Sequence, residues 1–508
     1  TLIQRDFAAA LRFILAESRN WPRLLLYGAG AHTKKLLEAG GQGLRDRVAA
    51  IIDRAAPEVG VFCGVATITP AQAAASDDAL AVVAHPVAEE AMATALRQAG
   101  MAAERILTVY ENPAYRSMAL ALAAPMATAD ADRLAGVARN VVVGSAKWAI
   151  ASDRELAAAL PPDVTVKIHF DPVERFTASP VFPTLDSGHS LDLLRLLLER
   201  LQPANIYLRT YVQTAPLAGL LRDWLPKARL IQEVYDFAGL LDERMLKRWM
   251  EFSDQAIDTS LLAELDTARR GDLVISKRRE IFWPPGLGTA GAPYRHYFGG
   301  MPPASPSQAP PHSAADAAIR ILYAGILPRP DQQSAHPSDY DFLPLLERLA
   351  ADGAFQVGLY NQMHDSPDQD RSFQNYIDRY RTGHVRYHRR VPYDKLLEEA
   401  TSFHFGWLCR QAGDERIPDT RLVFGQRFTG YVFAGLPVLV DPGWEAMAEL
   451  TTRFGAGLVL PEAADAETVA GRIAGADLPA LKRGVAALRD YMTKHNIDVL
   501  ETIRQIAG

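Results

Sequence analysis

The sequence has few cysteines, no long apolar run and no excess of positive charge, and each absence excludes a class of protein. Its two cysteines, Cys63 and Cys409, stand far apart, so neither a disulfide framework nor a cysteine-ligated zinc site is expected. No apolar stretch reaches the ~18–20 residues of a membrane span. With 54 Lys and Arg against 60 Asp and Glu, the chain has no overall attraction to nucleic acid. We therefore expect a cytoplasmic protein with no transmembrane segment and no nucleic-acid partner, while peripheral contact with a membrane stays open.

What the sequence does have is length and apolar residues, since 508 residues of 48% hydrophobic content suffice for about three domains. Short apolar runs alternate with segments of helical spacing along the whole chain, which is typical of parallel sheets covered by helices. We therefore predict an α/β fold of three consecutive Rossmann-like, doubly wound domains. The pattern predicts strands at 24–27, 48–52, 80–84, 106–109, 140–143, 164–170, 205–209, 229–235, 272–276, 319–325, 355–360, 384–387, 403–407, 436–440 and 457–460.

The same alternation gives the predicted domain boundaries. A Rossmann-like accessory domain is expected over residues 1–125, a second domain over 135–300 and a third over 317–508. The stretch between the last two is rich in proline, which propagates neither a helix nor a central strand, so residues 301–316 are predicted to be a linker.

Three segments of the last two predicted domains resemble the GT-B glycosyltransferases. They are residues 321–328 (ILYAGILP), 391–396 (VPYDKL) and 427–440 (RFTGYVFAGLPVLV). The first is similar to the opening strand and loop of the family's donor domain, the second to a strand-to-helix segment, and the third to the helix, Gly-Leu-Pro turn and strand beside the nucleotide-sugar site. The resemblance covers roughly residues 139–508, and it rests on the order in which the three segments occur.

The resemblance implies a two-domain cleft and a transfer reaction. The C-terminal domain would hold a nucleotide-diphosphate sugar, the middle domain would present an envelope glycan, a lipid-linked sugar or a protein as acceptor, and the last helices, 479–506, would cross back to the middle domain. It implies a hexosyl or related glycosyltransferase of polysaccharide biosynthesis that requires no metal and no cofactor besides the donor substrate.

A helix that starts near Gly425 is the strongest candidate site. The backbone amides of Gly425, Gln426 and Arg427 lie at the positive end of the helix dipole, where a diphosphate is stabilised. Arg421 and Arg427 are expected to add charge-assisted bonds, with Arg329 from the loop after the first strand of the domain. The alternative is that these arginines are solvated surface residues.

Further residues near this helix complete the predicted donor site. Gly325 ends the first strand of the domain, and Thr429 lies one turn into the helix. The aromatic residues Phe428, Tyr431 and Trp407 are candidates to stack a base or to wall the donor pocket, and the alternative for them is a place in the core.

The chain departs from the family at two positions. Many retaining members carry a glutamate five residues before the glycine of Gly-Leu-Pro and another about eight residues earlier, where this chain has Gly430 and Leu422. Ribose and sugar contacts must then come from residues such as Gln426, Thr429 or Asp419, or the chain belongs to a branch without that pair. A retaining mechanism with the usual glutamates is in doubt, and a non-catalytic binding or scaffold protein of the same fold is the alternative function.

On the acceptor side, two features follow predicted strands. Gly144 and Ser145 form a small-residue loop that allows phosphate or sugar to approach the backbone, with a tight turn as the alternative. Asp236 comes at the carboxyl end of a strand, where a carboxylate can take the proton of an acceptor hydroxyl. Glu233 and His189 are its rivals, and a structural or capping role is the alternative for each.

The first predicted domain carries part of a dinucleotide-binding pattern. Residues 28–30 supply two of the three glycines, Thr33 stands where the third is expected, and Asp53 has the spacing of a ribose-binding acid. With Gly64-Val65 and Thr69-Pro70, this segment resembles the small Rossmann-like domains of sugar-modifying acyltransferases and methyltransferases. The resemblance implies a sugar-nucleotide site or a structural appendage. An NAD-dependent enzyme that uses this domain is the third hypothesis.

Two Asp-x-Asp motifs, at 130–132 and 368–370, match the metal-binding pattern of other glycosyltransferases. Both are expected in polar connecting segments and not directly after a strand. No metal site is therefore predicted.

Overall fold

The structure is a computed structural model, and the residues that it describes follow the predicted alternation. They are residues 2–54, 56, 60–84, 89–145, 149–171, 178–188, 190–241, 246–247, 254–279, 292–300, 318–327, 342–365, 367–409, 421–461 and 464–508.

Three mainly parallel sheets with interleaved helices confirm the predicted fold class. Their strand orders are β3-β4-β2-β1-β5-β6, β13-β12-β11-β10-β7-β8-β9 and β16-β15-β14-β17-β18-β19. Only the short pair of β3 and β4 is antiparallel among the described strand pairs. In each sheet the first strand of the series is central, so the chain first builds one side of that strand and then the other.

The first sheet is built from apolar runs such as β2 (Val48–Ile52), which lies where the sequence predicts it. Its other strands are β1 (Arg23–Tyr27), β3 (Val61–Phe62), β4 (Val65–Ile68), β5 (Ala79–Val83) and β6 (Ile106–Thr108). The helices of this part are α1 (Leu2–Glu17), α2 (Ala31–Arg45), α4 (Pro70–Ala74), α5 (Glu89–Gln98), η1 (Ala103–Arg105) and α6 (Pro113–Ala135).

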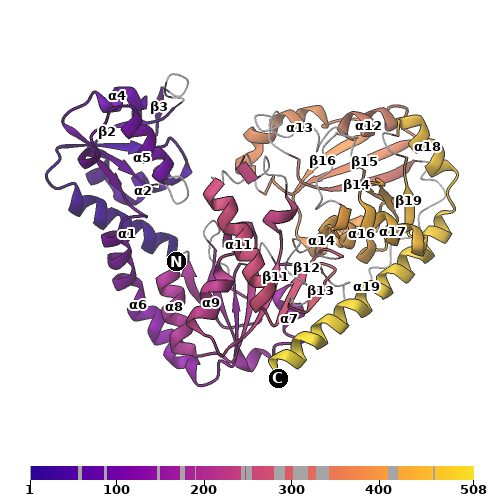
Figure 1. Ribbon diagram of the computed structural model, residues 1–508. Helices are drawn as coiled ribbons and strands as arrows, with labels where there is room; N and C mark the ends of the chain where they lie inside the picture. The colour runs from indigo at the N-terminus through magenta and orange to yellow at the C-terminus, as the bar shows by residue number, and fades with distance from the viewer. Residues whose placement is uncertain are drawn as a thin grey trace. The chain divides into compact units, whose positions relative to one another are not determined.

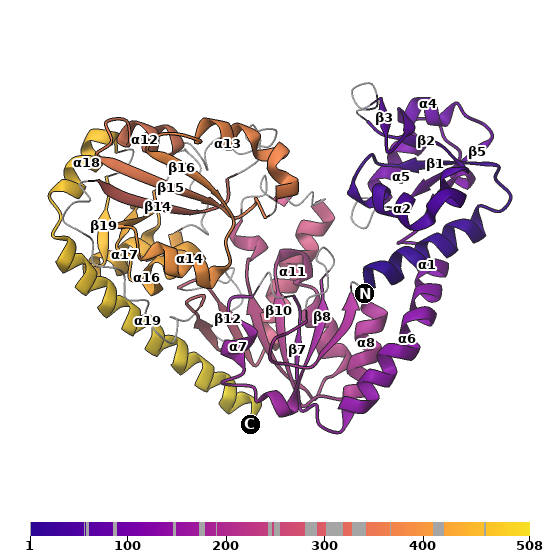
Figure 2. The same ribbon diagram turned by 180° about the vertical axis from the view of Figure 1, so that it is seen from behind.

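Helix α6 continues through the predicted domain end at residue 125, with Pro125 inside it. It lies beside α1 and α8 (Figure 2). The motif at 130–132 was expected in a connecting segment, and that expectation is wrong because these residues belong to α6. There Asp132 accepts a hydrogen bond of 3.1 Å from Arg200 on α8.

Helices of different lengths connect the strands of the second sheet. Its strands are β7 (Asn140–Val143), β8 (Thr165–Phe170), β9 (Thr184–Gly188), β10 (Asn205–Thr210), β11 (Arg229–Val234), β12 (Leu273–Ser276) and β13 (Tyr294–His296). The helices are α7 (Asp153–Leu156), η2 (Pro162–Val164), α8 (Leu191–Leu201), η3 (Val212–Thr214), α9 (Leu217–Trp224), η4 (Ala238–Leu240) and α11 (Asp254–Arg270). As predicted, Ser190 caps α8, with its side chain accepting from the amide of Leu193.

The third sheet has helices on both faces, with α12 and α13 on one and α14, α16 and α17 on the other (Figures 1 and 2). Its strands are β14 (Ile319–Gly325), β15 (Phe355–Asn361), β16 (Val385–Arg389), β17 (Phe405–Leu408), β18 (Val438–Val440) and β19 (Gly457–Val459). The helices are α12 (Phe342–Leu349), η6 (Pro367–Phe373), α13 (Gln374–Arg379), α14 (Tyr393–Ala400), α16 (Gln426–Phe433), α17 (Glu445–Phe454), α18 (Ala466–Ala474) and α19 (Leu478–Ala507).

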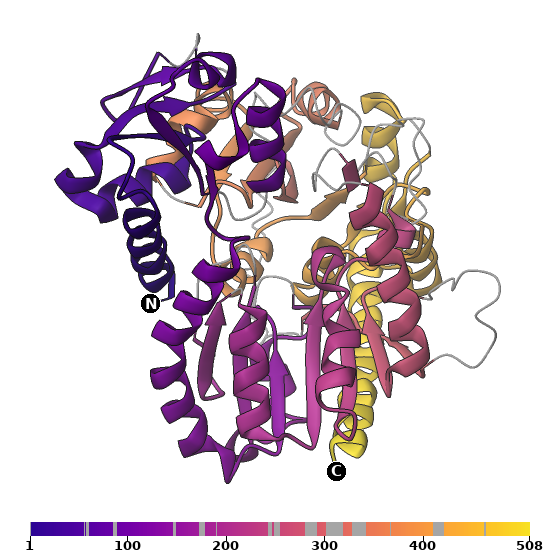
Figure 3. The same ribbon diagram turned by 60° about the vertical axis from the view of Figure 1, so that its left-hand side comes forward.

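Contacts divide the chain into two units, one of residues 1–145 with 163–203 and one of residues 146–162 with 204–508. Within the second unit, the 30-residue helix α19 contacts β19 and α17 near its start and β11 near its end (Figures 1 and 3). Asn205 donates to the carbonyl of Ala507 at 2.8 Å. The last helix therefore joins the third sheet to the β10–β13 part of the second unit.

Candidate functional site

Helix α16 is fixed in the third sheet by its buried tyrosine. Tyr431 Oη accepts a hydrogen bond of 2.8 Å from the amide of Ala324 on β14, and its ring packs on Gly406 of β17. Gly435 ends the helix with φ of +76°, a conformation that favours glycine, and the chain turns from there into β18. The start of α16 is thereby held at the carboxyl ends of β14 and β17, where the strand order of the sheet reverses. Ligands of doubly wound sheets bind at this point.

The first residues of α16 form the core of the candidate site. Gly425 caps the helix without a side-chain hydrogen bond, and Gln426 is exposed. Arg427 is half-buried, with its guanidinium 5.1 Å from the ring centroid of Tyr323. A Cβ atom on Gly325 would lie 2.9 Å from Arg427 Cδ and 2.8 Å from Tyr323 Oη. The predicted residues Gly325 and Arg427 are therefore neighbours, and a Cβ at position 325 would displace one of these side chains.

The other predicted arginines are placed differently. Arg421 is exposed and makes a two-pronged ion pair with Glu445 on α17, from Nε at 2.7 Å and from Nη2 at 3.0 Å. Its charge is therefore already balanced by a carboxylate. Arg329 and Asp419 lie outside the described residues.

Four further predicted residues have their side chains in the core. Phe428, Thr429 and Trp407 are fully buried and Tyr431 is 2% exposed, which agrees with the core alternative for the aromatic rings. Thr429 Oγ1 donates to the carbonyl of Gln426 at 3.1 Å, inside the helix. These residues shape the site by holding α16 in place.

Asn361, which the sequence analysis did not single out, holds the start of the loop after β14. This fully buried residue ends β15. Its Oδ1 accepts from the amides of Leu327 and Met363, each at 3.0 Å, and its Nδ2 donates to the carbonyl of Leu327 and to Tyr387 Oη, each at 3.0 Å. One neutral amide thus fixes both backbone groups of Leu327, two residues after Gly325.

The loop of residues 149–152 is held by a charged group instead. Glu233 on β11 is fully buried, and its carboxylate accepts from the amides of Ile150 at 2.7 Å and Ala151 at 3.2 Å and from Tyr207 Oη at 2.6 Å. Burial raises the pKa of Glu233, and the nearby positive charge of Arg209 opposes that rise. With all these bonds, Glu233 serves as an anchor of the loop, which fits the structural alternative for this residue.

Arg209 on β10 completes the charged anchor. It is also buried, and it donates to Asp153 Oδ1 at 2.6 Å and to the carbonyl of Ala151 at 2.7 Å. Its Nε lies 3.8 Å from the carboxylate of Glu233. Two acidic groups and one basic group therefore fasten the segment from residue 150 to the start of α7.

This anchored loop meets the start of α16 inside the second unit. Gln426 Nε2 donates to the carbonyl of Ala149 at 3.4 Å. A Cβ atom on Gly299 would lie 3.5 Å from Gln426 Cγ and 3.6 Å from the carbonyl oxygen of Ile150. Residues that follow β7, β13 and β17 thus converge on the helix start that carries Arg427.

Glu155 on α7 is the carboxylate beside the loop of residues 149–152 and Tyr297. Its Oε1 accepts from Tyr297 Oη at 3.2 Å, and its Oε2 accepts from the amide of Ser152 at 2.6 Å, so it also caps α7. Burial raises the pKa of Glu155, although the side chain remains half-buried. A Cβ atom on Gly300 would lie 3.1 Å from Tyr393 Oη.

Asp236 has the opposite environment. Lys277 Nζ lies 3.2 Å from its Oδ1 and Arg278 Nη2 lies 3.1 Å from the same atom. Burial acts to raise the pKa of Asp236, but the two cations outweigh it and the pKa is lowered. A carboxylate with a lowered pKa is a weak proton acceptor.

The loop that carries Asp236 is held by a third buried acid, Glu264 on α11. Its two oxygens accept from the amides of Ala238 and, at 3.1 Å, Gly239. Burial raises the pKa of Glu264 to about 7, against the effect of these two hydrogen bonds. This loop therefore depends on a group that titrates near neutral pH.

The remaining acceptor-side predictions belong to the first unit. Gly144 has φ of +126°, a conformation that favours glycine, and its amide donates to the carbonyl of Ile168 on β8 at 3.1 Å, so this residue continues the pairing of β7 with β8. The side chain of Ser145 is buried, and its Oγ has no hydrogen-bond partner within the described part of the chain. His189 lies outside the described residues.

The glycine loop of the first sheet is closed by its own side chains. Asp53 Oδ2 accepts from the amide of Ala29 at 2.8 Å, and Thr33 Oγ1 donates to the carbonyl of Gly28 at 2.5 Å. A hydrogen bond of 2.7 Å joins His32 Nε2 and Tyr110 Oη. The expected ribose-binding acid, Asp53, thus supports the loop itself.

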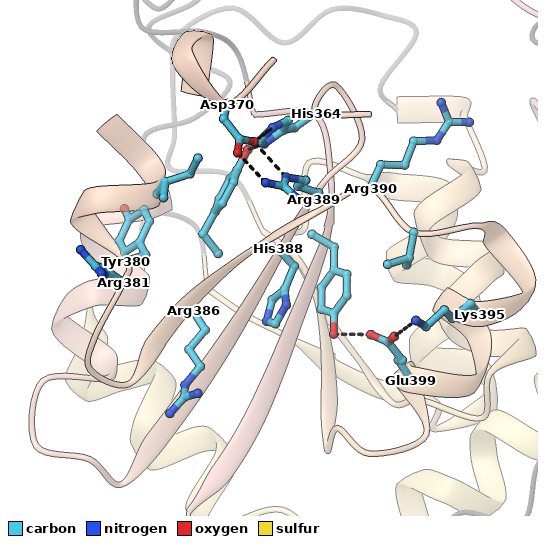
Figure 4. Close-up of a pocket in the computed structure, with 14 residues that line it drawn as sticks. His364, Asp370, Tyr380, Arg381, Arg386, His388, Arg389, Arg390, Lys395 and Glu399 are labelled. Carbon is cyan, nitrogen blue, oxygen red and sulfur yellow. Dashed lines mark hydrogen bonds and ion pairs between the residues drawn. The ribbon is translucent and has the colours of Figure 1, made fainter. Parts of the chain in front are cut away.

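A cavity of about 600 Å³ lies along the edge strand β16 (Figure 4). A chain of hydrogen bonds leads inward from it, from Arg389 to Asp370 at 2.9 Å, from Asp370 to His364 at 2.8 Å and from His364 to Tyr387 at 3.0 Å. Tyr387 in turn accepts from Asn361, so the cavity wall is continuous with the anchor of the loop after β14.

No helix among the described residues is long and apolar enough to cross a bilayer. No group of three or more His, Cys, Asp and Glu side chains in the described ranges is arranged to hold a metal ion.

No protein-family model matches the chain, and no curated protein matches it. Solved structures that are similar to it include Anabaena HepE in complex with UDP and glucose (14% identity, 72% of this chain and 100% of that chain, TM-score 0.47). A sucrose-phosphate synthase from Thermosynechococcus elongatus is similar at 16% identity, over 72% of this chain and 99% of that chain, with a TM-score of 0.47. The spinosyn forosaminyltransferase SpnP is similar at 15% identity, over 73% and 100%, with a TM-score of 0.41. The function of this chain therefore rests on its own residues.

Proposed function

We propose that the chain is a glycosyltransferase of the GT-B type that uses a nucleotide-diphosphate sugar. The observation that carries the proposal is the start of α16, where Gly425 caps the helix without a side-chain hydrogen bond and Arg427 lies against Gly325. A helix start with an adjacent guanidinium at the switch point of a doubly wound sheet suits a diphosphate. The acceptor is an envelope glycan, a lipid-linked sugar or a protein.

In this proposal the chain acts mainly by stabilising charge on the leaving diphosphate. The amides of Gln426 and Arg427 and the guanidinium of Arg427 neutralise the charge that develops as the glycosidic bond breaks. Because these groups carry fixed positive or partly positive charge, the reaction needs no metal ion. Arg329 is expected to assist, and Arg421 would have to leave Glu445 to do so.

The proton of the acceptor hydroxyl needs a carboxylate of suitable basicity. Asp236 was predicted for this role, but its two ion pairs lower its pKa. Glu155 has a raised pKa, is half-buried and lies with residues that meet the start of α16. We therefore propose Glu155 as the general base and keep Asp236 as its rival.

The test is hydrolysis or transfer with uridine, guanosine, cytidine and thymidine diphosphate sugars, after a thermal-shift screen of the same donors. Arg427→Ala should lower kcat/KM at least ~10-fold, because a transition-state charge contact of ~1.4 kcal/mol is lost. Arg453→Ala is the matched control, since Arg453 also lies over aromatic rings, at 5.2 Å from Phe454, but on α17. Equal rates for the two variants, or no shift and no turnover with any donor, would contradict the proposal.

A binding or scaffold protein of the same fold is the second candidate, motivated by Gly430 and Leu422 at the family's glutamate positions. It predicts that nucleotides bind while no sugar is released. For the predicted accessory domain, residues 1–125, we propose a sugar-nucleotide site or a structural appendage. If titration of the full chain with NAD shows no saturable binding, that result argues against the NAD-dependent alternative.

A further inference from the structure

The cavity along β16 is lined by more basic than acidic side chains. The basic residues fall into two groups, those that are paired with an acid and those that are not. Among the basic residues that line it, three are paired with acids within the third sheet. These pairs are Arg389–Asp370, Lys395–Glu399 and Arg390–Asp365.

Arg381 and Arg386 form the second group. Both line the cavity and are exposed, and neither has an ion-pair partner among the residues that the structure describes. Figure 4 places both of them away from the side occupied by Lys395 and Glu399. Like charges on one concave surface raise the local concentration of anions. The unbalanced part of the cavity therefore favours a ligand with more than one negative group.

An aromatic surface lies next to these charges. His388 is half-buried and stacks on Tyr360, with ring centroids 4.4 Å apart and an interplanar angle of 11°. Side chains alternate along a strand, so Arg386 and His388 share one face of β16. Burial lowers the pKa of His388, which leaves the ring uncharged at neutral pH. A flat, uncharged ring beside a guanidinium suits a ligand that has both an apolar face and an anionic group.

The walls of the cavity are already ordered by hydrogen bonds. Tyr360 Oη donates to Glu399 at 2.6 Å, and Arg389 Nε donates to Asp370 at 2.9 Å. Dashed lines in Figure 4 mark both interactions. Little side-chain entropy would be lost in these four residues on binding, so the ordering cost falls on Arg381 and Arg386.

We propose that this cavity binds an acidic oligosaccharide, with anionic groups on Arg386 and Arg381 and one sugar ring against His388. Its volume of about 600 Å³ is within the range of small-molecule sites, about 300–1,000 Å³. The inference goes beyond the proposed function, because it adds a second ligand and uses none of the residues at the start of α16.

The experiment is isothermal titration of the full chain with three trisaccharides of matched length. Trigalacturonate supplies carboxylates, phosphorylated maltotriose supplies phosphates, and unmodified maltotriose is neutral. At least one acidic trisaccharide should bind ~10-fold or more tightly than maltotriose. Which acid binds more tightly identifies carboxylate or phosphate as the preferred group.

Single substitutions then locate the site. Arg386→Ala and Arg381→Ala should each weaken the acidic ligand by ~5-fold or more. Arg379→Ala is the matched control, because Arg379 lies on the adjacent α13 but is paired with Glu347 at 2.7 Å. Affinity for UDP, measured on the same variants, should not change, so that failure here is distinguishable from failure of the proposed donor site.

Three results would overturn the inference. One is equal affinity for neutral and acidic trisaccharides. Another is inorganic phosphate binding as tightly as the acidic trisaccharides, which would show a site for any anion. The third is an unchanged affinity in the Arg386→Ala, Arg381→Ala double variant.

Discussion

The loop of residues 149–152 and the loop after β14 are both fastened by a buried side chain, but the first anchor is charged and the second is neutral. Glu233 holds Ile150 and Ala151 as a carboxylate and has Arg209 beside it. Asn361 holds Leu327 as an amide that donates and accepts. A charged anchor has a large desolvation cost, needs a counter-charge and responds to pH, whereas a neutral amide has a smaller desolvation cost, needs no counter-charge and does not titrate. We therefore expect removal of the two anchors to have different effects on stability and on its pH dependence.

The largest effect is expected at the charged anchor. Glu233→Ala should lower the free energy of unfolding of the second unit by about 3–5 kcal/mol, because Tyr207 and the amides of Ile150 and Ala151 lose their buried acceptor and Arg209 loses one of its two carboxylates. Denaturant unfolding of the full chain, followed by a probe in the second unit, measures this change. Glu449→Ala is the control, since it removes only the exposed pair with Arg279 and should cost below about 1 kcal/mol. A similar small cost for both variants would show that Glu233 is no anchor.

The next effect concerns the acid that lies with the charged anchor. Glu155→Gln should lower the transfer rate by about 10²-fold, because general bases contribute at least that factor, while UDP affinity stays constant. In the wild type the rate should rise with pH through the raised pKa of Glu155, because the base must be deprotonated. Asp236→Asn is the comparison variant. A larger loss in Asp236→Asn than in Glu155→Gln would return the role to Asp236.

The neutral anchor should give a smaller effect. Asn361→Leu leaves both backbone groups of Leu327 without their partner, at a cost of about 2 kcal/mol, and should weaken UDP binding through the displaced loop. Unfolding and UDP titration measure the two changes. Gln374→Ala, which removes an exposed hydrogen bond to Asp378, serves as the control. Unlike the loss at Glu233, the loss at Asn361 should not vary between pH 5 and pH 8.

The last effect is a pH dependence of stability at Glu264. Its pKa is raised to about 7 in the folded chain from an unfolded value of 4.5. The folded state therefore holds more protons between these values, and its stability falls as pH rises from about 4.5 to about 7. Glu264→Gln should flatten this part of the stability curve. If the slope is unchanged in that variant, another group causes it.

The sequence predicted the sheets well where strands are apolar and buried on both faces, as in β2 and β7. It did not predict β9, because Thr184–Gly188 is mostly small and polar. It placed a domain end at residue 125, which lies inside α6, and Pro125 is accommodated within that helix.

The candidate site was predictable only where chain neighbours define it. The glycine turn after α16 and the open helix start follow from local sequence. The roles of Asn361 and Glu233 do not follow from local sequence, because their contacts join residues that are 34 and 83 positions apart. The approach of Arg427 to Gly325 likewise depends on tertiary packing.

The most direct test of the central claim is a crystal structure of the chain soaked with UDP. The account predicts that the phosphates lie within hydrogen-bond distance of the backbone amides of Gln426 and Arg427, with the Arg427 guanidinium on the same group. Phosphates bound elsewhere, such as at Arg386 in the cavity along β16, would contradict it.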